Sequence, residues 1–306
     1  GLDVSIPLGD RALLLNLARG AIASRRAGAV TDVALPAVAS RIRVRADRWG
    51  RVAASAGRDR LWIARATARG RTRVVLVDRG ARVLRRLPPL RGTPDAIAAD
   101  GARVVIVGSD HGRRVVSRLD AAAEDARWTT RVLCRSVIEC VVTGVAVDAS
   151  TVVVASIDAV DVLTGARLAR TAHVALGDEE IEALALLRGR IVVAEPATSG
   201  LSVLDPATGA LRPFGPSLAR RSPGALGDGE VTALRATSSG LLVCGLFAHA
   251  GGARRAGLML LDPAGRLLPY RQPGGGCDRI ESGHGKVVLA FAEETRFRVV
   301  PGPEGT

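Results

Sequence analysis

Aromatic residues are scarce in this chain of 306 residues: Phe, Trp and Tyr make up 3% of the sequence, although 47% of the residues are hydrophobic. A large core must therefore be built from Val, Leu, Ile and Ala, and few rings are present on which nucleic-acid bases could stack. No apolar run approaches the ~18 residues of a transmembrane helix, so no membrane span is predicted. The hydrophobic content excludes a disordered chain, and the length fits one large domain or two ordinary ones.

Several motifs that carry chemistry are also missing. The sequence has no G-x-S-x-G nucleophile elbow and no phosphate-binding loop that ends in Lys-Ser or Lys-Thr. It has no C-x-x-C or paired-His spacing of the kind that binds zinc, and no cofactor is predicted. The N-terminus shows neither Met nor the basic and apolar regions of a signal peptide, so we expect a processed or trimmed chain.

A repeated pattern occupies most of the sequence. Residues 231–270 read as short apolar runs separated by Gly-rich turns, and residues 181–214 repeat the same order of runs. An Asp recurs after the third run, where its carboxylate can bond the backbone of a turn. The recurring residues are Asp78, Asp120, Asp161, Asp205 and Asp262. Units of about 40–45 residues with four short strands are typical of a β-propeller.

The repeats predict an all-β fold, a single β-propeller domain over residues 1–306 with seven four-stranded blades; six or eight blades are the alternatives. The last unit shows three strands, and residues 2–8 have no place in the first unit. We therefore expect residues 2–8 to pair with residues 295–300 and to close the ring. The predicted blades are approximately 11–47, 51–88, 94–130, 141–173, 180–215, 230–271, and 277–301 together with 2–8.

Residues 181–271 resemble the delta-60 repeat, a bacterial propeller-like repeat found mostly in large secreted or surface proteins. The matching segments are VTAL (231–234), CGLF (244–247), Gly251-Gly252, LLD (260–262) and LDPATGALRPF (204–214). The chain departs from the pattern at Cys244, where the repeat usually has a small residue such as Gly. The resemblance implies a structural framework and no common catalytic residue.

The four cysteines favour a location outside the cytoplasm, secreted or on the cell surface. Cys134 and Cys140 flank the insertion CRSVIEC, which a local disulfide would staple. Cys244 lies on the second strand of its unit and Cys277 opens the next, so these two could meet between blades. Disulfides are the favoured interpretation, with buried free thiols and a metal site as alternatives.

Polar residues at the ends of the second strands are the candidates for catalysis. With these strands in register, a ring of carboxylates and imidazoles falls near one mouth of the central channel, where it could bind a divalent metal or supply a general acid and base. The alternative is that strand ends are exposed and polar for structural reasons. The candidate residues are Asp110, His111, Asp158, Glu195, His249 and Glu293.

Basic residues are concentrated in one stretch. The chain has a net charge of +13, and residues 41–91 alone, with 16 Arg and three acidic residues, carry that charge. Because side chains alternate along a strand, arginines on the outer strands of the first two blades would form a strip on the rim. This strip is either a solvated face or a contact for an acidic partner. The predicted strip residues are Arg41, Arg43, Arg45, Arg82, Arg85 and Arg86.

The sequence thus favours a non-enzymatic secreted or cell-surface propeller that acts as a binding or structural module. The alternatives are a propeller hydrolase or lyase that uses the carboxylate and histidine ring, and a polyanion-binding module that uses the arginine-rich blade. The expected partners are another protein, a second protomer or an anionic surface polymer. Nucleic acid is not favoured, because the basic stretch offers only Trp49 and Trp62 for base stacking.

Overall fold

Short antiparallel strands make up the protein, whose structure here is a computed structural model. The structure describes residues 4–8, 11–16, 21–26, 31–34, 40–43, 52–56, 60–67, 69–78, 83–123, 125–138, 140–176, 181–195, 200–219, 229–270, 277, 279–283, 286–291 and 296–303. Up to residue 61 it describes strand backbones only. None of the described segments is a helix, so none provides a helix that could cross a membrane.

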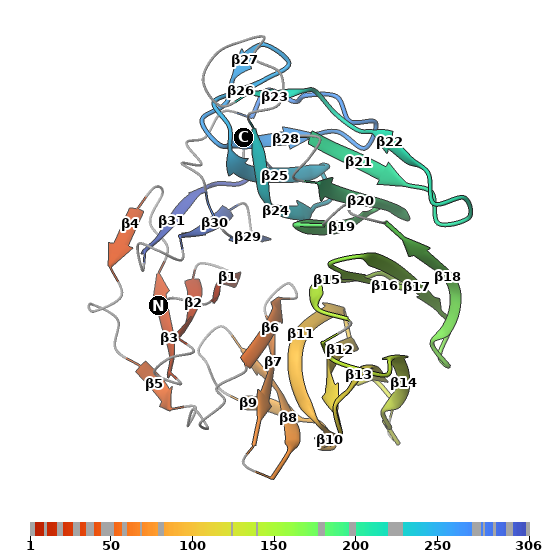
Figure 1. Ribbon diagram of the computed structural model, residues 1–306. Coiled ribbons are helices and arrows are strands. Elements are labelled where there is room, and N and C mark those ends of the chain that lie inside the picture. Colours follow the sequence, from red (N-terminus) through yellow and green to blue (C-terminus); the bar gives the residue numbers. More distant parts are fainter. Residues whose placement is uncertain are drawn as a thin grey trace.

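Five antiparallel sheets follow one another along the chain (Figure 1), and consecutive strands are neighbours except that β5 pairs with β3 and β10 pairs with β8. The first contains β1 (Val4–Leu8), β2 (Arg11–Asn16), β3 (Ala21–Arg26) and β5 (Ser40–Arg43). The second contains β6 (Val52–Ala56), β7 (Arg60–Ala66), β8 (Arg71–Asp78), β9 (Val83–Arg86) and β10 (Leu90–Arg91). The third contains β11 (Thr93–Asp100), β12 (Arg103–Asp110), β13 (Arg113–Asp120) and β14 (Thr129–Cys134). The fourth contains β15 (Val142–Val147), β16 (Thr151–Ser156), β17 (Ala159–Thr164) and β18 (Ala169–Ala175), and the fifth β19 (Ala183–Leu187), β20 (Arg190–Glu195), β21 (Gly200–Leu204) and β22 (Leu211–Pro213).

The C-terminal part of the chain forms three further sheets. One contains β24 (Glu230–Ala236), β25 (Leu241–Leu246) and β28 (Leu258–Leu261). A small sheet of β23 (Leu218–Ala219), β26 (His249–Ala250) and β27 (Ala253–Arg254) includes a hairpin inserted between β25 and β28. The last contains β29 (Arg279–Gly283), β30 (Lys286–Phe291), β31 (Arg296–Pro301) and β4 (Thr31–Ala34).

The larger sheets stand around a common centre, with the first strand of each sheet innermost (Figure 1). Neighbouring inner strands contact one another in the order β1, β6, β11, β15, β19, β24 and β29, and β29 also contacts β1. Because each sheet presents its edge to the centre, successive sheets can pack face to face, as the second does with the third and the third with the fourth.

The last sheet corrects one prediction. Its strand β31 pairs with β30 on one side and with β4 on the other, where Arg296 is opposite Ala34. Strand β1 instead pairs with β2, with Leu8 opposite Arg11. The expectation that residues 2–8 pair with 295–300 is therefore wrong. The dipeptide Gly9-Asp10, which stands between two apolar runs, is a hairpin signal and indicates that β1 pairs with β2.

Aliphatic side chains fill the spaces between successive sheets, as the scarcity of aromatic residues predicts. The second strands are buried on both faces, including residues 104–107 of β12, 152–155 of β16 and 191–194 of β20. One cluster, for example, packs Val107 of the third sheet together with Val154 of the fourth. Side chains that are small or β-branched allow the sheets to pack face to face.

A β-bulge recurs near the start of three inner strands, and it leaves one residue outside the ladder. These extra residues are Asp95 in β11, Thr143 in β15 and Thr232 in β24. Glycines stand opposite two of the bulges: a Cβ atom would lie 2.2 Å from a backbone oxygen at Gly108 and 1.9 Å from one at Gly245. The bulges thus require glycine on the second strand and turn Asp95 and Thr232 toward neighbouring segments.

The recurring Asp residues cap turns at three of the described positions. Asp120, Asp205 and Asp262 each accept a hydrogen bond from the backbone N–H two residues further on, at 3.0, 2.9 and 2.8 Å. At Asp205 the bond from the backbone of Ala207 is the main cause that lowers the pKa of the carboxyl. These contacts agree with the turn role that the repeat predicts.

Asp161 departs from this pattern. It lies inside β17 rather than after it, because that strand continues to Thr164. Its buried carboxylate forms an ion pair with Arg170 at 3.0 Å and a hydrogen bond with His173 at 2.9 Å, both from β18. The prediction of a turn at Asp161 is therefore wrong, and the residue pairs two strands through charge.

Tyr270 joins the loop after β28 to the end of β31. It is the only tyrosine of the chain; its hydroxyl donates a 2.7 Å hydrogen bond to the backbone oxygen of Pro301. Burial raises the pKa of Tyr270. The folded state thus favours the neutral phenol, which stabilises the fold. This stabilisation is complete below the pKa of tyrosine in the unfolded chain, about 10. It is lost as the pH rises through the higher pKa of Tyr270 in the folded protein.

In an alkaline titration we expect phenolate absorbance to appear only with unfolding, as followed by circular dichroism. The chain offers its own control, because no second tyrosine contributes to the signal. Free ionisation of the native protein at a pH of about 10 would contradict the buried hydroxyl.

Candidate functional site

The predicted catalytic residues that the structure describes lie at or just after the ends of second strands, except His249, which lies in the small sheet. Asp110 ends β12, Asp158 follows β16, Glu195 ends β20 and His249 begins β26. Glu293 lies outside the described residues. Asp110, Asp158, Glu195 and His249 therefore belong to four different sheets.

Among these candidates the structure brings together Asp110 and His111, which are also neighbours in the sequence. The His111 Nδ1 atom lies 2.9 Å from the Asp110 carboxylate, and the imidazole is 80% exposed. Asp158 accepts a 3.2 Å hydrogen bond from the Ser156 hydroxyl, and Glu195 is buried. Within the described part of the chain, no three His, Cys, Asp or Glu side chains form a group that could hold a metal ion. The catalytic role of the ring therefore stays a prediction.

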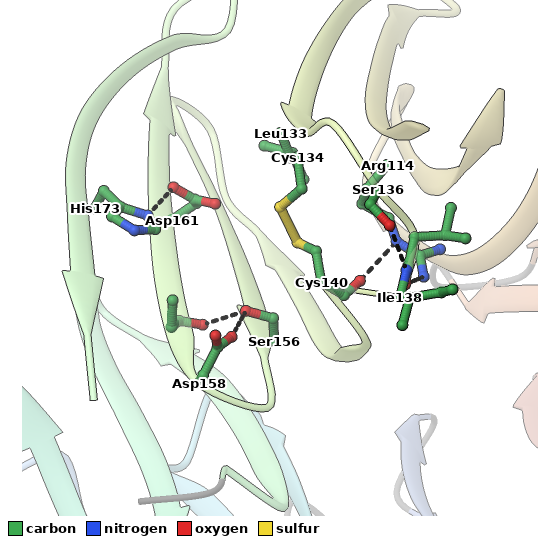
Figure 2. The surroundings of a disulfide bond; sticks show 12 residues. Arg114, Leu133, Cys134, Ser136, Ile138, Cys140, Ser156, Asp158, Asp161 and His173 are labelled. Carbon is green, nitrogen blue, oxygen red and sulfur yellow. Dashed lines mark hydrogen bonds and ion pairs between the residues drawn. A yellow bond between two sulfur atoms is a disulfide. The ribbon is translucent and has the colours of Figure 1, made fainter. Parts of the chain in front are cut away.

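A short loop stapled by a disulfide lies beside this end of the third sheet (Figure 2). Cys134 and Cys140 are bonded, with their Cα atoms 6.1 Å apart, and they close the connection between β14 and β15. The backbone N–H of Val137 donates a 3.0 Å hydrogen bond to the oxygen of Gly112 in the β12–β13 turn. The predicted local disulfide is confirmed, and the loop is also fixed to its neighbouring turn.

Arg114 of the neighbouring strand β13 holds the same loop (Figure 2). Its Nε donates to the backbone oxygen of Cys140 at 2.9 Å, and its Nη2 donates to the oxygen of Val137 at 3.4 Å. The remaining Nη1 forms an ion pair with Asp95, the extra residue of the β11 bulge. Sequence analysis missed Arg114; the available signal is its place in β13, where alternation puts it on the same face as buried Val116.

Exposed apolar side chains surround this rigid loop. Ile138 is 85% exposed, although its backbone N–H is bonded by the Ser136 hydroxyl at 3.2 Å. Val141 and Ile157 are also exposed and lie on segments joined by a 3.0 Å backbone hydrogen bond. We call this region the stapled-loop surface; it comprises Arg113, Val132, Arg135, Ile138, Val141 and Ile157.

The stapled-loop surface combines apolar and cationic groups. Arg113, Val132 and Arg135 line a shallow hollow of about 490 Å³. Both arginines are exposed. The surface is therefore suited to contact an apolar side chain that is flanked by acidic groups.

The second disulfide has a structural setting. Cys244 of β25 and Cys277 before β29 are fully buried and joined, with Cα atoms 5.9 Å apart. The Thr232 hydroxyl, at the β24 bulge, bonds the backbone oxygen of Cys277. The predicted pairing between neighbouring units is confirmed, and none of the four cysteines is free.

The predicted basic strip is described in part. Strands β5 and β9, which contain Arg41, Arg43, Arg85 and Arg86, are outer strands of the first and second sheets. Arg45 and Arg82 lie outside the described residues. Arg85 and Arg86 are both exposed, and Arg85 donates to the backbone oxygen of Ala121, which directly follows β13 of the third sheet. Arg85 therefore links the second and third sheets by a hydrogen bond. That the basic strip binds a polyanion stays a prediction.

No family model matches this chain, and no curated protein is similar to it in sequence. The delta-60 resemblance therefore stays a prediction. Among solved structures, the chain is similar to the WD40 β-propeller domain of Doa1, with 9% identity, a TM-score of 0.60 and coverage of 98% of this chain and 93% of that chain.

Two further structures show the same likeness. The β-propeller domain of Cps50 (Swd1) from Myceliophteria thermophila is 11% identical, with a TM-score of 0.60 and coverage of 98% of this chain and 96% of that chain. BamB from Moraxella catarrhalis is 15% identical, with a TM-score of 0.55 and coverage of 97% and 95%. Together with the antiparallel sheets around a common centre, these likenesses show that the chain has a β-propeller fold.

Proposed function

We propose that the chain is a single closed propeller of seven blades that acts outside the cytoplasm as a non-enzymatic binding module. The cycle of contacts among inner strands from β1 to β29 supports seven blades and closure. The pairing of β4 with β31 also supports closure, because it joins an N-terminal segment to the C-terminal sheet. The two disulfides support an oxidising location such as the cell exterior.

The stapled-loop surface is the proposed binding site. The observation that carries this proposal is the 85% exposure of Ile138 in a loop held by the Cys134–Cys140 disulfide and the guanidinium of Arg114. A large apolar side chain held in a fixed position loses little conformational entropy when a partner covers it. Such preorganised anchors contribute most of the binding energy in protein interfaces.

The charges near the stapled loop define the chemistry of the partner. Arg113 and Arg135 are exposed and line a hollow with Val132, and Arg135 belongs to the same disulfide loop as Ile138. Guanidinium groups bind carboxylates through paired hydrogen bonds. The proposed partner is therefore a protein segment with an apolar side chain between acidic residues.

Selection of peptides from a random displayed library tests this proposal. We expect peptides selected on the wild-type protein to be acidic around one apolar residue. Their affinity should fall at least about tenfold for Ile138→Ser, because truncation of a central anchor costs about 1–2 kcal/mol or more. The measurement is the Kd of each synthetic peptide by calorimetry.

Leu84→Ser is the matched control, since Leu84 is also a large apolar residue that is exposed, and it lies on β9 in another sheet. It should leave peptide affinity unchanged, and both variants should keep the wild-type Tm. Selected peptides that bind Ile138→Ser and the wild type equally would refute the stapled-loop surface as the binding site.

A further inference from the structure

Four arginines gather on one face of the second sheet, away from the stapled-loop surface. Arg71 and Arg73 alternate along β8, and Arg91 of β10 is directly opposite Arg71. Arg86 of β9 is opposite Val75, two residues beyond Arg73 on the same face. We call Arg71, Arg73, Arg86 and Arg91 the arginine cluster; all four are exposed.

The opposite face of these strands is buried, which fixes the cluster toward solvent. Thr72, Val74 and Leu76 alternate with the exposed residues of β8 and are at most 6% exposed. Leu87 and Leu90, which lie within the segment RRLPPLR, pack into the same core between the second and third sheets. The apolar residues of each strand thus hold the arginines outward.

The backbone beneath the cluster is held by hydrogen bonds. The indole N–H of Trp128 donates to the backbone oxygen of Pro88 at 2.7 Å. The Thr72 hydroxyl donates to the oxygen of Gly92 at 2.8 Å. The positions of the four arginines are therefore set by the fold rather than by a mobile loop.

The charge of the cluster is not compensated within the described part of the protein. None of its four guanidinium groups forms an ion pair with a described acidic residue, whereas Arg114 and Arg170 in other sheets do. Like charges directly opposite each other on a sheet are destabilising, and Arg71 and Arg91 are such a pair. An anionic ligand would relieve this repulsion.

We infer that the arginine cluster is a binding site for an anionic carbohydrate polymer that carries repeated sulfate, phosphate or carboxylate groups. Arginines two residues apart on a strand are separated by about 7 Å, and opposite residues by about 5 Å, so several anionic groups of one flexible polymer can be bound together. Arginine suits such groups because its planar fork donates paired hydrogen bonds.

Carbohydrate fits better than nucleic acid. Binding of single-stranded nucleic acid uses exposed aromatic rings for base stacking, and the described rings nearest this sheet, Trp62 and Trp128, are buried and half-buried. The disulfides indicate an oxidising environment. The inference does not depend on the stapled-loop surface, because it uses other residues on another sheet.

Heparin, a sulfated carbohydrate polymer, is the probe for the test. We expect the wild-type protein to bind heparin with an affinity that falls as salt rises. The slope of log Kd against log salt should decrease by roughly one for each arginine removed. The heparin affinity at low salt should fall at least about tenfold in the triple variant Arg71→Ser/Arg73→Ser/Arg91→Ser. The Tm of this variant should not fall, since the substitutions remove a like-charge pair.

The control makes the same change in net charge at exposed arginines away from the second sheet: Arg167→Ser/Arg212→Ser/Arg254→Ser. It should retain most of the heparin affinity. Equal losses in the two triple variants would overturn the site and indicate a response to net charge alone. If the cluster triple variant does not fold, Arg73→Gln/Arg91→Gln takes its place with the same expectation.

Two other polyanions separate the chemical classes. Single-stranded oligo-dT and poly-glutamate of matched charge should bind more weakly than heparin. Tighter binding of either polymer would overturn the assignment to carbohydrate. Ile138→Ser should leave heparin binding unchanged, so failure of this inference is distinguishable from failure of the peptide-binding proposal.

Discussion

Replacement of both Cys244 and Cys277 by alanine is expected to lower the free energy of unfolding by about 4 kcal/mol, the value of the chain-entropy model for a loop of this length. The two residues are separated by 33 positions, and the bond joins β25 to the segment before β29. Both side chains are fully buried. Loss of the bond releases a long loop in the unfolded chain and loosens the contact between two neighbouring sheets.

The second disulfide supplies an internal comparison. Cys134 and Cys140 are separated by six positions, and the same model gives about 2 kcal/mol for Cys134→Ala/Cys140→Ala. Urea denaturation of both double variants and the wild type measures the difference, and thiol titration under denaturing, non-reducing conditions should find no free thiol in the wild type. Equal losses in the two double variants, or four titratable thiols, would contradict this account.

Features with local causes could be predicted from the sequence. Asp205 and Asp262 lie in short turns with Pro and Gly, and their carboxylates bond the nearby backbone as expected. The Cys134–Cys140 pair is close in the sequence. The Cys244–Cys277 pair could be predicted because the repeat places one residue on a second strand and the other at the start of the next unit.

The strand that completes the last sheet could not be assigned in this way. Residues 31–34, TDVA, form a short strand whose partner β31 lies at the other end of the chain. Pairing depends on backbone hydrogen bonds that most sequences can make, so the side chains of so short a strand do not identify its partner. The local hairpin signal at Gly9-Asp10 was the better guide to the position of residues 4–8.

Buried charges were the other features that sequence patterns did not predict. Arg114 and Asp161 both lie inside strands, where a charged residue is usually taken to face solvent. Their burial depends on partners from other segments: Asp95 of the β11 bulge for Arg114, and Arg170 and His173 of β18 for Asp161. Such partners become visible only when the sheets are assembled.

Replacement of Arg114 by methionine should lower the free energy of unfolding by about 3–5 kcal/mol, since it removes one partner of a buried ion pair. The side chains of Arg114 and Asp95 are 7% and 15% exposed. Methionine fills similar space but removes the cation beside the Asp95 carboxylate and the donors to the oxygens of Val137 and Cys140. The stapled loop should also lose its fixed position, so peptides selected on the wild type should bind this variant more weakly.

Arg113→Met is the matched control, because the neighbouring Arg113 is exposed and an exposed substitution usually changes stability by less than about 0.5 kcal/mol. Arg114→Met/Asp95→Leu should recover part of the lost stability, since replacing both members of a buried pair avoids an uncompensated charge. Urea denaturation of the three variants measures these differences. If Arg114→Met is no less stable than Arg113→Met, the ion pair does not hold the loop, and the rigid presentation of Ile138 must depend on the disulfide alone.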